Sequence, residues 1–398
     1  MGDANGLVDE LIRPALLIPG PVDFDKAILK AMSSDAEFHL GTSFVNVFGE
    51  VLSMLRCLVQ TTDPESQPFV ISGSGTLGWD LVAANLVEAG EDVLVLQTGY
   101  FADCFMECCE NYGINAVEIK APVGHRPQVV EVEAALREAV LRERPYKIMQ
   151  LTHVDTSTGV RIPLQPLVQL VRRVSPSTLV VVDGVCSLGC EEIAFDEWDL
   201  DVVMAATQKA VGCPAGLSLM MCSSRAMTVF QSRRSKPASY YASFGKWLPV
   251  MRTYEARKLG YFATVSTQLI HALHTALTLI LSRPLAERFA QHAQASAKVK
   301  QAVAEMGLKQ IAPNPADQTN AITAMYLPVG LTPIDILPRL LQRGVILAEG
   351  LHKNLLTRCI HFGHMGVVVT DDERDDIDRG IGALREVLQE VKDEKGLV

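Results

Sequence analysis

A lysine and an aspartate, Lys209 and Asp183, each follow a short apolar run in this chain of 398 residues. The run 202–204 comes shortly before Lys209, and the run 179–182 ends directly at Asp183. A β-branched run of this kind is typical of a buried parallel strand, whose end delivers a side chain to the carboxyl edge of the sheet. The pattern therefore predicts that one acid and one lysine meet at the same sheet edge.

A glycine-rich turn supplies a third feature. The apolar run 69–71 leads into the turn at 72–78, and an amphipathic stretch follows to residue 89. A strand, a glycine-rich turn and a helix start form an anion site, because backbone N–H groups point at the ligand there. A lysine for a Schiff base, an acid for a ring nitrogen and a phosphate site together suit pyridoxal phosphate. We therefore expect pyridoxal phosphate as the cofactor.

The same turn also matches the G-x-G-x-x-G pattern of dinucleotide sites. Such sites need an acidic residue at the end of the next strand, where it binds a ribose. Here the next predicted strand, 92–96, is followed by Gln97, Thr98 and Gly99. The dinucleotide interpretation would also leave Asp183 and Lys209 without a role, and we set it aside.

Composition indicates a packed globular protein, with 48% hydrophobic and 21% charged residues. The net charge of −10 argues against nucleic-acid binding, which needs a basic face. No apolar stretch approaches the roughly 20 residues of a membrane span. The nine cysteines include no C-x-x-C pair, and the first residues lack the features of a secretion signal. We expect a cytoplasmic protein with reduced thiols.

Strands and helices alternate from residue 68 to about 221. Seven apolar runs of strand length are separated mostly by amphipathic stretches of helix length. This alternation predicts an α/β fold with a mostly parallel seven-stranded sheet and helices on both faces. After residue 307 the pattern changes to that of a small α+β unit. We expect an N-terminal arm (1–21), a large cofactor-binding domain (22–307) and a small C-terminal domain (308–398).

Four segments in this order resemble the class V aminotransferases, pyridoxal-phosphate enzymes of fold type I. They are Ser74-Gly75-Thr76, the segment 152–159 (THVDTSTG), the segment 182–185 (VDGV) and the segment 207–210 (TQKA). The resemblance extends from about Pro14 to Lys392 and is strongest to the alanine–glyoxylate and serine–pyruvate aminotransferase branch. It implies a homodimer that acts on small amino acids and 2-oxo acids.

The resemblance also implies a role for each matching residue. Lys209 would hold the cofactor and move the proton, and Asp183 would keep the ring nitrogen protonated. Phe101 and Val185 would lie on opposite faces of the ring. Tyr261 and Thr264 would reach the phosphate of the neighbouring subunit. The remaining predicted contacts are Ser74, Gly75, Thr76, Thr156 and Gln208 for the cofactor, and Gly20 for the substrate.

One position departs from the family pattern. The family usually has an arginine where this chain has His361, in the stretch 357–366 (TRCIHFGHMG), and that arginine grips the substrate carboxylate. A histidine is a weaker and pH-dependent partner. Either Arg358 or a shifted register supplies the charge, or the substrate or chemistry is altered. His361 and His364 have no evident third ligand nearby, so we expect no metal site.

The sequence thus predicts an aminotransferase that moves an amino group from alanine or serine to glyoxylate or pyruvate. The alternative, suggested by His361, is a pyridoxal-phosphate lyase, a decarboxylase or a carbon–carbon bond-forming enzyme. A partner-binding protein that has lost its activity is a third hypothesis. It is disfavoured because the lysine, the acid, the stacking aromatic and the phosphate turn are all present.

Overall fold

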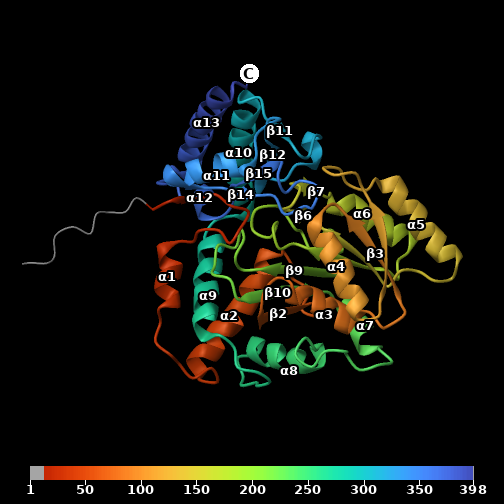
Figure 1. The fold of residues 1–398 in the computed structure, drawn as a ribbon. Coiled ribbons are helices and arrows are strands. Elements are labelled where there is room, and N and C mark those ends of the chain that lie inside the picture. The colour runs from red at the N-terminus through yellow and green to blue at the C-terminus, as the bar shows by residue number, and fades with distance from the viewer. Residues whose placement is uncertain (1–12, 398) are drawn as a thin grey trace, which may run out of the picture.

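A seven-stranded sheet forms the centre of the larger part of the molecule (Figure 1). The structure is a computed structural model that describes residues 13–397. The strand order is β2-β10-β9-β8-β5-β3-β4, and all strands run parallel except β10, which is antiparallel to both neighbours. This confirms the predicted α/β fold. The strands are β2 (Gln67–Ser72), β3 (Asp92–Gln97), β4 (Asn115–Lys120), β5 (Ile148–Thr152), β8 (Leu179–Asp183), β9 (Val202–Ala206) and β10 (Leu217–Cys222).

The central strands are apolar along their whole length because helices cover the sheet. Every residue of β5, β8 and β9 is buried, as expected of parallel strands that are packed on both faces. One continuous hydrophobic core joins the sheet to its helices. These are α1 (Lys26–Met32), α2 (Thr42–Leu58), α3 (Leu77–Leu86), α4 (Tyr100–Asn111), α5 (Val129–Leu141), α6 (Leu164–Val174), α7 (Ser224–Gln231), α8 (Phe244–Glu255) and α9 (Thr267–Leu281).

A smaller α+β unit lies at one end of the molecule, where Figure 1 shows the blue C-terminal elements together. Its antiparallel sheet has the order β11-β12-β15-β14. The long helix α10 (Leu285–Glu305) contributes Val299, Ala302 and Val303 to the core of this unit. The other elements are β11 (Lys309–Gln310), β12 (Ile322–Tyr326), α11 (Pro333–Gln342), β13 (Val345–Ile346), β14 (Ala348–Glu349), β15 (Cys359–Gly363), α12 (Val367–Thr370) and α13 (Asp376–Lys395), with a 3-10 turn at Pro315–Asp317.

The described part of the N-terminal arm is built into the smaller unit. Strand β1 (Ala15–Leu16) pairs in parallel with β13. The backbone then runs beside β15, where Gly363 N donates to Leu17 O at 2.7 Å. A Cβ at position 363 would lie 2.0 Å from Ile18 O, so only glycine permits this close approach. Residues 1–12 of the predicted arm lie outside the described residues, and the proposed domain limits stay a prediction.

A small hairpin connects the two units. Strands β6 (Val154–Asp155) and β7 (Val160–Arg161) pair antiparallel directly after β5, and Figure 1 shows them at the junction. Val160 also bridges to Gln318, which precedes β12. The hairpin therefore touches both the large sheet and the smaller unit.

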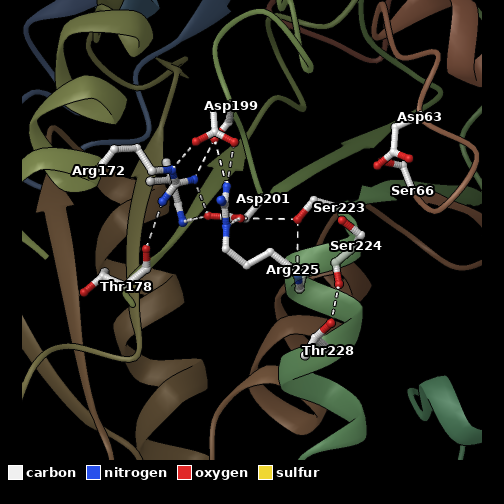
Figure 2. A network of polar contacts seen from close by, with 12 residues as sticks. Asp63, Ser66, Arg172, Thr178, Asp199, Asp201, Ser223, Ser224, Arg225 and Thr228 are labelled. Carbon is white, nitrogen blue, oxygen red and sulfur yellow. Dashed lines mark hydrogen bonds and ion pairs between the residues drawn. The ribbon is translucent and has the colours of Figure 1, made fainter. Parts of the chain in front are cut away.

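A network of ion pairs around the buried Asp201 lies at the end of the large sheet opposite to Lys209 (Figure 2). Asp201, directly before β9, is fully buried and pairs with Arg172 at 2.7 Å and with Arg225 at 2.5 Å. It also accepts a hydrogen bond from Val180 N at 2.6 Å. Because each of its oxygens has a partner, this carboxylate can be buried in the charged form.

Among residues 13–397, no single helix is long and apolar enough to cross a bilayer. The pair α9 and α10, bent by 88° at its break, satisfies the length and composition criteria only when taken together.

Candidate active site

A cavity of about 170 Å³ opens at the carboxyl edge of the large sheet. Thirteen residues line it, and nine of them are residues that the sequence predicted as cofactor contacts. The nine are Ser74, Gly75, Thr76, Phe101, Thr156, Asp183, Val185, Gln208 and Lys209. The structure therefore brings together the lysine, the acid and the glycine-rich turn, although they lie far apart in the chain.

Lys209 reaches the cavity from the turn that follows β9. Its Nζ donates a hydrogen bond to the backbone oxygen of Pro19 in the N-terminal arm. Burial lowers the pKa of Lys209, while the neighbouring Cys186 and Asp183 raise it in part. A lowered pKa leaves more of the amine unprotonated, and the unprotonated amine is the nucleophile that attacks an aldehyde.

Asp183 is the last residue of β8 and is almost completely buried. Its carboxylate accepts hydrogen bonds from Trp79 Nε1 at 2.9 Å and from Val185 N at 3.0 Å. Burial raises the pKa of Asp183, and these two hydrogen bonds together with the charge of Lys209 oppose that rise. The carboxylate is thus held in one orientation and presented to the cavity.

The glycine-rich turn lies at the N-terminus of α3. Thr76 is the N-cap residue, and its hydroxyl makes no capping hydrogen bond. A Cβ at Gly75 would lie 2.9 Å from Val185 Cγ2 and 3.2 Å from Ala206 Cβ, so the turn requires a residue without a side chain there. Gln208 Oε1 is buried and has no hydrogen-bond partner among the described residues. A helix N-terminus with free polar groups is suited to a phosphate.

Four further lining residues were not predicted from the sequence: Trp79, Thr152, Val154 and Cys186. Thr152 ends β5 in register with Asp183, so its position at the end of an apolar run could have identified it. Trp79 lies one helical turn after Thr76. The only signal for it in the sequence is its indole N–H, which usually has a hydrogen-bond partner when it is buried.

Some predicted residues do not line the cavity of the single chain. Tyr261 is 61% exposed, and neither it nor Thr264 is among the lining residues. Arg358 is exposed just before β15, where its backbone oxygen accepts a hydrogen bond from Leu327 N at 2.8 Å. Gly20 adjoins Lys209, because a Cβ at position 20 would lie 2.6 Å from Lys209 Cδ.

His361 lies in the middle of β15 and is 1% exposed. Its Nε2 atom is 3.9 Å from Cys359 Sγ. Burial, and secondarily the charge of Lys209, lower the pKa of His361 to about 4. The imidazole is therefore neutral near pH 7. Among the described residues that line the cavity, Lys209 is the only one with a cationic side chain.

Comparison with known proteins identifies the family of this chain. The profile of the family "Aminotransferase class-V" matches residues 30–364. This chain belongs to the class V aminotransferases.

Three relatives illustrate its place in the family. Alanine–glyoxylate aminotransferase 1 of Saccharomyces cerevisiae is 38% identical over 361 residues, which cover 88% of this chain and 92% of the yeast protein. The crystal structure of alanine–glyoxylate aminotransferase from Nostoc sp. has a TM-score of 0.85 and 30% identity, covering 97% of this chain and 98% of the other. Ureidoglycine–glyoxylate aminotransferase of Bacillus subtilis has a TM-score of 0.84 and 25% identity, covering 95% and 94%.

Proposed function

We propose that this class V aminotransferase uses pyridoxal phosphate to move an amino group from alanine or serine to glyoxylate or pyruvate. The observation that carries the proposal is the meeting of Lys209 and Asp183 in one cavity beside the glycine-rich turn. The names of the three relatives share the acceptor glyoxylate and differ in the donor. Glyoxylate is therefore the better supported acceptor, and alanine the better supported donor.

The residues of the cavity fit this cofactor. Lys209 would hold the aldehyde carbon, and Asp183 would face the ring nitrogen. Phe101 and Val185 offer apolar surfaces for the two faces of a ring. The phosphate would lie at the start of α3, against Ser74, Gly75, Thr76 and Gln208, with Thr156 beside the ring. When bound, pyridoxal phosphate withdraws electrons from the Cα atom of an amino acid, which makes the Cα proton acidic.

The chain itself supplies the proton chemistry. The free Lys209 amine would take the proton from the Cα atom of the amino acid onto Nζ and pass it to the C4′ atom of the cofactor. Its lowered pKa favours the unprotonated form that this step requires. Asp183 would stabilise positive charge at the ring nitrogen, because its carboxyl group lines the cavity and is held by hydrogen bonds from Trp79 and Val185.

The residue expected to bind the substrate carboxylate, His361, gives some support to a second function. The neutral His361 offers a hydrogen bond but no positive charge near pH 7. A site of this kind binds an α-carboxylate less tightly than a guanidinium would. We therefore keep a pyridoxal-phosphate lyase, decarboxylase or carbon–carbon bond-forming enzyme as the alternative.

A homodimer is part of the proposal. Large apolar side chains are exposed on α1, on α9 and in the segments between helices: Leu29, Met32, Phe38, Leu259, Tyr261 and Leu279. Helix α1 packs against α9, and the ring of His39 lies 5.6 Å from that of Tyr261. An apolar face of this extent suits an interface between two copies. There Tyr261 and Thr264 would reach the partner's phosphate site.

We also propose a cytoplasmic location. All nine cysteines are free thiols in the structure, and burial raises the pKa values of the buried thiols of Cys109, Cys186, Cys213, Cys222 and Cys359. Burial keeps these thiols protonated and unreactive, which is typical of structural cysteines in a reducing compartment.

Two measurements test the proposal. Borohydride reduction of the loaded protein followed by peptide mapping should label Lys209, and a label on another lysine would refute the assignment. The protein should then be incubated with a panel of amino acids without any 2-oxo acid. An aminotransferase stops after one half-turnover per site, whereas a lyase or decarboxylase continues to release product. Continued release would support the alternative function.

The dimer has its own test. Mixing a Lys209→Ala variant with a Tyr261→Phe, Thr264→Val variant should restore activity if each site draws residues from both chains. A monomer in solution with full activity would contradict the shared site.

A further inference from the structure

Asp155 is a buried carboxylate that has no part in the chemistry described above. It ends β6, is fully buried and lies between two cavity-lining residues, Val154 and Thr156. Its Oδ1 atom accepts hydrogen bonds from Ser157 N at 2.9 Å and from Ser157 Oγ at 2.6 Å. Its Oδ2 atom has no hydrogen-bond partner of normal geometry among the described residues. Burying a carboxylate while one of its oxygens has no hydrogen-bond partner costs free energy, which suggests that Asp155 has a specific role.

The side chains around Asp155 hold the segment that leads into α4. Ser157 Oγ, which donates to Asp155, also accepts a hydrogen bond from Tyr100 N at 3.0 Å. Thr158 Oγ1 donates to Thr98 O at 3.1 Å. The turn of the β6–β7 hairpin therefore makes hydrogen bonds to the start of α4 and to the segment before it, although the two segments are distant in sequence.

Gly99 shows how tight this contact is. A Cβ at Gly99 would lie 2.3 Å from Ser157 Oγ and 2.7 Å from Asp155 Oδ2. Gly99 is the N-cap residue of α4 and, as a glycine, has no side chain that could cap the helix. The first amides of a helix need acceptors from elsewhere, and a negative charge near them is favourable. Asp155 and Ser157 supply both the acceptor and the charge to this helix.

The next residue along α4 faces the cofactor cavity. Phe101 is the second residue of the helix and lines the cavity, where it would cover one face of the cofactor ring. We propose that Asp155 is a positioning residue that caps α4 through Ser157 and thereby holds Phe101 against the cofactor. This inference rests on the proposed cofactor, and it assigns Asp155 no contact with substrate or with the reacting atoms.

The charges around Asp155 agree with this role. Burial, and to a smaller extent the nearby Asp183, raise the pKa of Asp155, whereas Ser157 and the Phe101 amide lower it, and the net pKa is about 6. Asp155 in turn raises the pKa values of the thiols of Cys104 and Cys186. Asp155 is thus ionised above about pH 6, when it can cap the helix, and loses that capacity as it is protonated.

A double-mutant cycle on cofactor binding tests the inference. The variants are Asp155→Asn, Phe101→Leu and the combination of the two. The dissociation constant of pyridoxal phosphate is measured by titrating each apoprotein, and unfolding of each apoprotein by urea is measured in parallel. We expect Asp155→Asn and Phe101→Leu each to raise the dissociation constant about tenfold. If Asp155 acts through Phe101, the double variant should be no weaker than the worse single variant.

Asp201→Asn is the matched control, because Asp201 is also fully buried but lies at the opposite sheet edge. It should lower stability and leave the dissociation constant unchanged. Should Asp155→Asn fail to fold, Ser157→Ala removes the connecting hydroxyl and should raise the dissociation constant severalfold, again without adding to Phe101→Leu.

Three results would overturn the inference. One is an unchanged dissociation constant in Asp155→Asn or Ser157→Ala while the wild type binds the cofactor. Another is a double variant whose loss equals the product of the single losses. A wild-type protein that does not bind pyridoxal phosphate would overturn the proposed function and this inference with it.

Discussion

The indole N–H of Trp79 donates a hydrogen bond of 2.9 Å to Asp183 Oδ2, which joins the first turn of α3 to the end of β8. The glycine-rich turn precedes α3 directly, so this bond also ties the proposed phosphate site to the proposed partner of the ring nitrogen. Because Asp183 is almost completely buried, a hydrogen bond to its charged form has a large effect on its pKa.

Replacing Trp79 with phenylalanine should raise the pKa of Asp183 while leaving its carboxyl group in place. The hydrogen bond lowers the pKa of Asp183, so its loss should raise that pKa. We expect the acidic limb of kcat/KM to move to higher pH and kcat/KM near neutrality to fall about tenfold. Asp183→Asn should slow Cα deprotonation by orders of magnitude while the cofactor stays bound. A Trp79→Phe profile that coincides with the wild type would show that the bond is irrelevant to Asp183.

Gly75→Ala should damage cofactor binding through sterics alone. The new methyl group would lie 2.9 Å from Val185 Cγ2, and Val185 is expected to pack against the ring. We expect the dissociation constant of pyridoxal phosphate to rise at least tenfold, as measured on the apoprotein. Gly382→Ala in α13 is the control, because no heavy atom lies within 4 Å of its new Cβ and alanine favours a helix. Equal cofactor affinity in both variants would contradict the tight packing at Gly75.

His361 should give no histidine-like pH dependence near neutrality. An exposed histidine clamp would lose substrate affinity as pH rises through about 6.5. Burial lowers the pKa of His361 to about 4, so its charged form is lost well below that pH. We expect the KM for alanine to be flat between about pH 6 and 8 and to fall about tenfold in His361→Arg. A steep rise of KM above about pH 6.5 would show instead that the bound substrate carboxylate raises the pKa of His361 and keeps the ring charged.

Asp201 should contribute to stability and not to catalysis. Arg172 and Arg225 share two carboxylates, the exposed Asp199 and the buried Asp201, and Asp201→Ala removes the buried one. We expect a loss of roughly 2–4 kcal/mol in the free energy of unfolding, measured with urea. Asp199→Ala, at a side chain that is 54% exposed, should cost less than about 1 kcal/mol. Similar losses in both variants would argue against a special role for the buried carboxylate.

The features that the sequence predicts correctly depend on few neighbouring residues. Lys209, Asp183 and the glycine-rich turn each follow an apolar run, and that local pattern is enough to indicate strand ends at one sheet edge. The α/β fold follows from the same alternation of runs. Such signals are local because the period of a strand or helix shows within one segment.

The contacts that no local pattern predicts join distant segments. Trp79 meets Asp183 across 104 residues, and Ser157 meets Tyr100 across 57. Each of these contacts exists only because the sheet brings the two segments together. Only the folded chain therefore decides which polar group donates to Asp183 and which one caps α4.

His361 shows the same division between sequence and structure. The sequence by itself determined that position 361 is a histidine, where the resemblance to class V aminotransferases led us to expect an arginine, and also that Lys209 and Asp183 are present. The tertiary structure decided that this histidine is neutral, because it buries the ring in β15 within reach of the charge of Lys209. Charge state depends on desolvation and on neighbours in space, and neither can be read from the order of residues in the chain.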